Sequence, residues 1–157
     1  MNEAYRNLLE RRSIRKYDTR PVPDEVLDAI LLAGIHAPSG MNTQGVRLVA
    51  VRDPETVSYL SRLNAAVMGA THDPFYGANC VVIVLADPEL YNGWVEDGAL
   101  ALGNMMNAAH ALGLGSCWIH RAKQVFDSPE GKELLEKMGP AHPSSRRGQL
   151  HPGLPRL

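Results

Sequence analysis

The chain has 157 residues, 45% of them hydrophobic and 21% charged, with a formal net charge of −1, and such a composition is typical of one globular domain with a sizeable core. Because the charge is nearly balanced, no broad positive field favours nucleic acid or an anionic membrane surface as a partner. The sequence has no apolar run of transmembrane length and no apolar signal segment at its start, which predicts a cytoplasmic protein.

The first predicted element is a short amphipathic helix over residues 2–10, in which Leu8 and Leu9 lie at helical spacing with other apolar residues. A cluster of cations with one hydroxyl follows it: Arg11, Arg12, Ser13, Arg15 and Lys16. Two interpretations are open. The cations are a solvated helix end facing the negative end of the helix dipole, or they form a phosphate site, because guanidinium groups and a hydroxyl offer several donors to a dianion.

A second amphipathic helix is predicted over residues 24–33, after an extended connector with two prolines. The next segment, 37–45, reads Ala-Pro-Ser-Gly-Met-Asn-Thr-Gln-Gly and contains little that packs in a core, so it either turns or binds. Its amides favour binding. In an extended segment Asn42 and Gln44 would face the same side and match the polar edge of a flat heteroaromatic ring.

A strand, a helix and a second strand are predicted next. Residues 47–51 form the first strand, and Asp53 with Pro54 begins a helix that continues to about Val67. Asn64, near the end of this helix, is either a helix-terminal amide or a ligand contact. Residues 80–85 form a continuous apolar, β-branched run, which predicts a strand buried on both faces.

The helix predicted over about 95–112 is apolar on nearly every face, with recurring small residues at Gly98, Ala99, Ala101, Gly103, Ala108 and Ala109. Such a helix is buried, either wrapped by the rest of the chain or packed against its own copy in a symmetric dimer. We prefer the dimer, because small side chains allow close approach. Gly113 ends the helix, a strand follows over 114–120, and Ser128 caps a last helix that continues to Met138.

Alternating helices and strands predict a layered fold with five helices and a thin sheet of three strands. The tail, residues 140–157, has four prolines and is predicted to be disordered, so it does not supply the strand that would complete the sheet.

Several kinds of site have no signature here. No Gly-x-Gly-x-x-Gly follows a strand, there is no P-loop, Ser39 lacks the hydrolase elbow, and the histidines show no metal-ligand spacing. Cys80 and Cys117 lie in apolar runs, which predicts two buried free thiols. Glu96 and Asp97 are adjacent, so they point in different directions on a helix and are interpreted as favouring its positive N-terminal end.

Three motifs in this order resemble the nitroreductase family of FMN-dependent oxidoreductases: Arg-Arg-Ser-Ile-Arg-Lys-Tyr at 11–17, Ala-Pro-Ser-Gly-Met-Asn-Thr-Gln at 37–44, and Ala-Ala-His-Ala-Leu-Gly-Leu-Gly-Ser-Cys-Trp-Ile at 108–119. The resemblance covers about Tyr5 to Gly139. It implies an α+β fold, a sandwich with a central mixed sheet flanked by helices, that forms a homodimer with two flavins at its interface. Residues 1–139 would be the FMN-binding domain and 140–157 an aberrant tail.

The resemblance also implies the FMN-binding residues. The phosphate and ribityl chain would be held by Arg11, Arg12, Ser13 and Arg15. The ring would be lined by the amide loop of the other subunit, through Pro38, Ser39, Gly40, Asn42 and Gln44. Asn64 would contact the edge of the ring, and the segment of Ile119, His120 and Arg121 would pass near it. Family members take a hydride from NAD(P)H and pass the electrons to a nitroaromatic, quinone or similar acceptor. This chemistry belongs to the flavin and implies no catalytic side chain and no metal.

The chain departs from the family pattern at two places. Gly45 and Val46 stand where the family often has Pro-Trp, which would loosen the loop. After about Gly139 the strand ending in Leu-Gly-Tyr-Pro and the arm that reaches the partner are missing. The ending resembles a truncated or frameshifted product, which predicts weaker flavin binding and a weaker dimer.

The leading hypothesis is therefore an FMN-dependent NAD(P)H oxidoreductase. An alternative is a non-catalytic module that binds flavin or another small ligand on the same scaffold, and a third is a structural dimer without a ligand.

Overall fold

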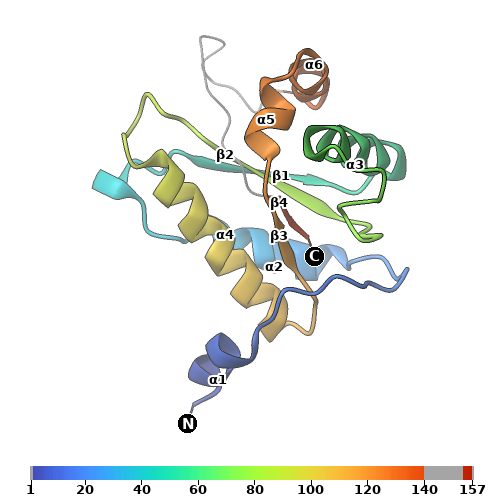
Figure 1. Ribbon diagram of the computed structural model, residues 1–157. Coiled ribbons are helices and arrows are strands. Elements are labelled where there is room, and N and C mark those ends of the chain that lie inside the picture. The colour runs from blue at the N-terminus through green and yellow to red at the C-terminus, as the bar shows by residue number, and fades with distance from the viewer. Residues whose placement is uncertain (1, 140–153, 157) are drawn as a thin grey trace.

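The computed structural model describes residues 2–139 and 154–156 as helices and strands joined by short connections (Figure 1). The helices are α1 (Glu3–Glu10), α2 (Asp24–Ile35), α3 (Pro54–Met68), α4 (Trp94–Ala111), α5 (Ala122–Asp127) and α6 (Pro129–Lys137), with a short 3₁₀ turn, η1 (Gly40–Asn42). The strands are β1 (Val46–Val51), β2 (Val81–Ala86), β3 (Cys117–Ile119) and β4 (Leu154–Arg156). Every helix and strand predicted from the sequence is present, with shifted ends.

The helix ends follow the capping signals in the sequence. The Asp53 carboxylate accepts a hydrogen bond from the Thr56 N–H at 2.8 Å and begins α3, and the Ser128 hydroxyl accepts one from the Gly131 N–H at 3.0 Å and begins α6. Gly69, with φ of 66°, ends α3 in the left-handed conformation that glycine adopts without strain. These helix ends therefore follow from local capping chemistry.

The strands form one sheet in the order β1-β2-β4-β3, and all its ladders are antiparallel. β1 and β2 pair along their whole length, from Val46 opposite Ala86 to Val51 opposite Val81. A single parallel bridge joins Ser13 to Ser116 beside β3. The α+β class is confirmed, and within the described residues this bridge is the only parallel pairing of the mixed sheet that the resemblance implied.

The prediction that the tail supplies no strand is wrong for residues 154–156. β4 lies between β2 and β3 and gives the sheet a fourth strand. Three residues are too few to show a period of two, and a proline argues against a central strand, so the sequence pattern concealed it. Positions 140–153 and 157, for which disorder was predicted, lie outside the described residues.

Helices cover both faces of the sheet, and each face has its own core (Figure 1). Val81, Ile83 and Leu85 pack on the side of α3, α5 and α6. Val82 and Val84 pack on the opposite side against α2 and α4. β2 is thus buried on both faces, as its unbroken apolar run predicted.

α4 is buried on one side only within a single chain. Its buried residues face α2 and the sheet, among them Ala101, Leu102 and Met105. On the other side Val95 and Leu100 are 42% and 48% exposed. The rest of the described chain leaves this side of the helix uncovered, and packing against a second copy stays a prediction.

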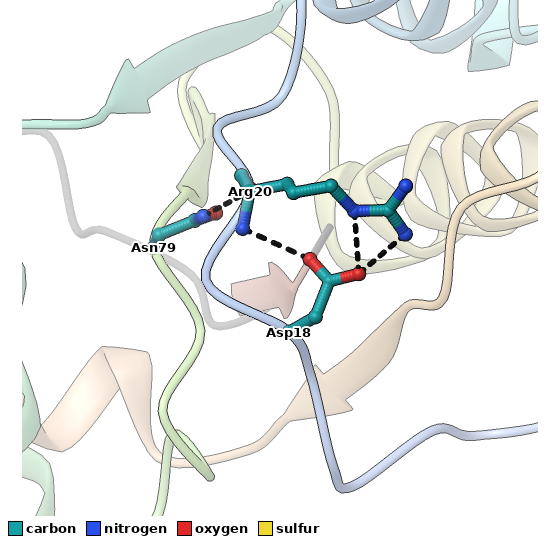
Figure 2. A network of polar contacts seen from close by, with 3 residues as sticks. All are labelled: Asp18, Arg20 and Asn79. Atoms are coloured by element: carbon teal, nitrogen blue, oxygen red, sulfur yellow. Dashed lines mark hydrogen bonds and ion pairs between the residues drawn. The ribbon is translucent and has the colours of Figure 1, made fainter.

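The connector between the cation cluster and α2 is anchored to the start of β2. The Asn79 amide donates to the Arg20 carbonyl at 2.6 Å, and the Asp18 carboxylate accepts from the Arg20 backbone N–H and guanidinium (Figure 2). The guanidinium lowers the pKa of Asp18, mainly through the side-chain hydrogen bond. Both side chains are solvent-exposed, so we assign the pair a local ordering role.

Both cysteines are buried free thiols, as predicted. Burial raises the pKa of the Cys80 thiol to about 11, against the opposing effect of the Arg52 guanidinium. Among the described residues no helix has the length and apolar character to span a bilayer.

We expect Cys80 to give a measurable pH dependence of stability. An unfolded cysteine ionises near roughly pH 8.5, so above that pH the unfolded chain holds fewer protons than the native one. Stability therefore falls as the pH rises from about 8.5 to about 11, by about 3 kcal/mol in all. Urea unfolding of the wild type and of Cys80→Ala between pH 7 and 10.5 checks this. The variant should lose less stability with pH, and equal slopes would exclude this ionisation as the cause.

Candidate functional site

The cation cluster lies along the beginning of β3. Ser13 and Ser116 form the parallel bridge, and the Ile14 N–H donates to the Ser116 carbonyl at 3.0 Å. Gly115 permits this approach, because a Cβ atom there would lie 3.0 Å from three side-chain atoms of Ile14. The backbone of the cluster is therefore fixed to the sheet.

The three predicted arginines of this cluster have different surroundings. Arg12 Nη1 donates to the carbonyls of Leu9 and Arg11 at 2.6 and 2.9 Å, so Arg12 caps the C-terminal end of α1. Arg15 is exposed, with a long contact of 3.5 Å to the Ser13 carbonyl. Arg11 is partly buried, and its Nη1 atom is fully buried with no hydrogen-bond partner among the described residues.

A second polar atom without a partner lies close to this cluster. Ser116 is 1% exposed, and its hydroxyl has no hydrogen-bond partner in the described part of the chain. Sequence reasoning missed this residue, since a serine inside an apolar strand gives no signal beyond its own polarity. A buried hydroxyl and a buried guanidinium N–H each lose free energy unless something accepts their hydrogen bonds.

The amide loop is a tight turn rather than the extended segment that the spacing predicted. Residues 40–42 form η1, and three non-glycine residues of the loop have positive φ: Met41, Asn42 and Gln44, at 52°, 55° and 51°. The Gln44 amide nevertheless donates to the Asn42 Oδ1 at 3.3 Å, and both side chains are exposed with Pro38. The two amides thus lie together, brought there by the turn.

The loop is held from within and from α4. The Gln44 N–H donates to the Ser39 hydroxyl at 3.0 Å, and the Gly40 N–H donates to Asp97 Oδ1 at 2.9 Å. Asp97 is 5% exposed. Sequence reasoning assigned Asp97 only to the helix dipole, because the burial of a first-turn carboxylate cannot be read from its position.

Asn64 lies against the segment after β3. It is fully buried, its amide donates to the His120 carbonyl at 3.1 Å, and its Oδ1 accepts from Arg121 Nε at 3.3 Å. Arg121 has φ of 77°, an unfavourable conformation for a residue with a side chain. Asn64 therefore fixes this segment, in which Ile119 is buried and His120 exposed. Direct contact of Asn64 with a ligand stays a prediction.

A small apolar cavity of about 230 Å³ adjoins the same segment, lined by residues of β2, α4 and β3 and including Trp118 and His120. A larger cavity of about 590 Å³ lies around the first half of α3 and the loop 71–79, and none of the predicted site residues lines it. Its polar groups already bond one another, as in the Ser61–Asp73 and Arg62–Ser58 pairs. We therefore assign the site chemistry to the smaller cavity and its surroundings.

The two halves of the predicted site lie at opposite ends of α4. The Asn7 amide donates to the Asn107 carbonyl, which places α1 near the C-terminal end of α4. The Gly40–Asp97 hydrogen bond places the amide loop at the N-terminal end. Ten residues separate Asp97 from Asn107, about 15 Å along the helix. One chain alone does not bring the cation cluster and the amide loop together.

Comparison with known proteins identifies relatives of this chain. The model of the nitroreductase family matches residues 8–72 and 65–136. A protein of Archaeoglobus fulgidus that bears the names NADH dehydrogenase and NAD(P)H nitroreductase is 37% identical, over 76% of this chain and 68% of its own length. An FMN reductase [NAD(P)H] of Bacillus subtilis is 30% identical, over 99% of this chain and 71% of its own length. The chain spans about two thirds of the length of such relatives.

Solved structures show the same fold. A nitroreductase of Bacteroides fragilis with bound FMN superposes with a TM-score of 0.88 at 30% identity, covering 100% of this chain and 88% of the other. A nitroreductase of Desulfitobacterium hafniense with bound FMN gives 0.84 at 27% identity, with the same coverage. The family model matches most of the chain and the fold is shared, so this chain belongs to the nitroreductase family.

Proposed function

We propose that this chain is an FMN-dependent NAD(P)H oxidoreductase that works as a homodimer. The observation that carries the proposal is the buried Nη1 atom of Arg11, which has no partner in the described chain. A guanidinium N–H held out of water needs a hydrogen-bond acceptor, and an anionic acceptor makes the strongest bond with it. The phosphate of FMN is such an acceptor, and relatives with this fold bind FMN.

The residues of the cluster fit a phosphate. Arg11 offers a charged donor, and Ser116 offers a buried hydroxyl without a partner in the part of the chain that the structure describes. Ser13 lies beside Ser116 across the parallel bridge and is exposed. A cation two residues before a bridged pair of serines, with their two hydroxyls, offers donors to the several acceptor oxygens of a phosphate group.

Bound FMN supplies the redox chemistry, by accepting a hydride from NAD(P)H and passing electrons on to an acceptor. The chain's own residues bind and orient. Arg11 neutralises the anionic end, and Asn64 fixes the segment 119–121 through two hydrogen bonds. Trp118, 39% exposed beside the small apolar cavity, provides a flat surface that an aromatic ring can contact. None of these roles requires a side chain to exchange a proton.

A symmetric dimer would complete the site. If two copies of α4 pack antiparallel across a two-fold axis, the N-terminal end of one approaches the C-terminal end of the other. The amide loop of one subunit then approaches the cation cluster of its partner. Apolar side chains already lie exposed on α1 and on the outer side of α4: Tyr5, Leu8, Leu9, Val95 and Leu100. They supply the surface that such contact would bury.

The visible absorption spectrum of the purified protein, before and after NADH or NADPH, tests the proposal. Protein that is yellow and bleaches on addition of the nucleotide supports the oxidoreductase. Yellow protein that stays oxidised supports the alternative, a flavin carrier without turnover. Colourless protein that takes up no added FMN would contradict both.

We propose nitroaromatic compounds, quinones or similar flat molecules as electron acceptors. An apolar surface such as that around Trp118 would select for shape more than for specific hydrogen bonds. The cytoplasmic location expected from the sequence stays a prediction.

A further inference from the structure

The amide loop has a backbone that its own residues do not favour. Met41, Asn42 and Gln44 all have φ between 51° and 55°, where a side chain crowds the backbone. Such conformations persist only when the surrounding structure imposes them, and they gather at functional sites. Hydrogen bonds within the loop, such as that from the Gln44 N–H to the Ser39 hydroxyl, together with a contact from outside it, therefore hold it in place.

Asp97 is the group outside the loop that bonds it most directly. Its Oδ1 accepts from the Gly40 N–H at 2.9 Å, across 57 positions of sequence, and the carboxylate is almost completely buried. Hydrogen bonds to an ionised acceptor are stronger than neutral ones. Tyr91 also lies against Gly40, because a Cβ atom there would lie 1.9 Å from its ring. Gly40 therefore lies close to both Asp97 and Tyr91.

The helix dipole does not account for this arrangement. Glu96 lies in the same first turn of α4, is exposed, and can interact with the dipole equally well. Burying the neighbouring carboxylate costs free energy that only specific hydrogen bonds offset. Asp97 differs from Glu96 in the contact that it makes with the loop.

We propose that Asp97 is a positioning residue for the FMN site, which fixes the amide loop so that the amides of Asn42 and Gln44 meet the flavin ring bound mainly by the partner subunit. This inference rests on the proposed function. It assigns to Asp97 a role that neither its position in the helix nor the motifs of the sequence indicated.

Three variants test it: Asp97→Ala, Asp97→Asn, whose amide oxygen still accepts from Gly40, and the matched control Glu96→Gln. Amide hydrogen exchange of residues 37–45 in flavin-free protein is measured first. We expect exchange at least tenfold faster in Asp97→Ala, largely restored in Asp97→Asn and unchanged in Glu96→Gln. Unchanged exchange in Asp97→Ala would overturn the proposal, whether or not the wild type binds FMN.

The dissociation constant for FMN is measured next, by flavin fluorescence. We expect it to rise about tenfold in Asp97→Ala and less in Asp97→Asn. If the loop is loosened in Asp97→Ala but the affinity for FMN and the flavin spectrum are unchanged, the proposed role of Asp97 in the FMN site is wrong. If wild-type protein binds no FMN, the proposed function fails, while the exchange experiment still decides whether Asp97 holds the loop.

Mixing subunits tests the placement of the loop. A heterodimer of Asp97→Ala and Arg11→Ala subunits would have one site with an intact cation cluster and an intact partner loop, and one site with neither. We expect FMN binding at about half of the sites of this heterodimer, above that of either homodimer. No gain on mixing verified heterodimers would show that loop and cluster do not act across subunits.

Discussion

Replacing Arg11 with alanine is expected to weaken FMN binding about a hundredfold, which corresponds to about 3 kcal/mol. The reason is the buried Nη1 atom, which has no partner within the described chain, so a hydrogen bond to the phosphate would replace none that this atom already makes. Hydrogen bonds between a guanidinium and a phosphate are charge-assisted, and a buried site strengthens them. Titration of apo-protein with FMN, followed by fluorescence quenching, measures the effect.

Arg12→Ala is the matched control. Its guanidinium donates to the carbonyls of Leu9 and Arg11, so its loss should loosen the end of α1 and change FMN affinity only a few-fold. Without FMN, Arg11→Ala should be at least as stable as the wild type, because it removes a buried N–H that lacks a partner. Equal losses of affinity in the two variants would mean that the cluster acts as a diffuse positive surface.

The largest expected effect on stability is at Gly131. A Cβ atom there would lie 1.9 Å from the Val125 carbonyl oxygen and 2.8 Å from Phe126 Cα, both backbone atoms that cannot rotate away. The Ser128 hydroxyl also donates to the Val125 carbonyl at 2.7 Å, so opening the turn between α5 and α6 would break this hydrogen bond. We expect Gly131→Ala to lower the free energy of unfolding by about 3 kcal/mol.

Glu130→Ala provides the comparison, because Glu130 is exposed in the same helical turn and its loss should cost about 0.5 kcal/mol. Urea unfolding of both variants measures the difference. Since α5 follows directly after the segment 119–121, Gly131→Ala should also weaken FMN binding. A stability within 0.5 kcal/mol of wild type would show that the α5–α6 turn relaxes easily.

The parts of the fold that sequence could predict have strong local causes. β2 is an unbroken β-branched run, and Asp53 with Pro54 determines where α3 begins. α5 was missed because it has six residues and begins after Arg121 in a left-handed conformation, without a capping side chain. β4 was missed because its three residues acquire a strand conformation from β2 and β3 on either side.

The candidate site could likewise be predicted only in part. Its motifs indicated which segments matter, and the structure places Asn64 against His120 and Arg121 and the amides of Asn42 and Gln44 side by side. The different surroundings of Arg11 and Arg12 could not be predicted, since neighbouring arginines look alike until the turn of the chain buries one of them. The importance of Asp97 and Ser116 could not be predicted either, because both are buried by residues that are distant in the sequence, and no local sequence pattern indicates such burial.

Helix α1 has a consequence for how the protein behaves on dilution. It has eight residues, none of them buried in the single chain, and it stands apart from the main body (Figure 1). A helix this short is marginal in water without tertiary support. In the proposed homodimer the partner would give this support, so the far-UV circular dichroism of the protein should depend on its concentration, and residues 2–10 should become sensitive to proteases when the subunits separate. Cofactor retention would then be set by the total amount of protein present as well as by the site itself.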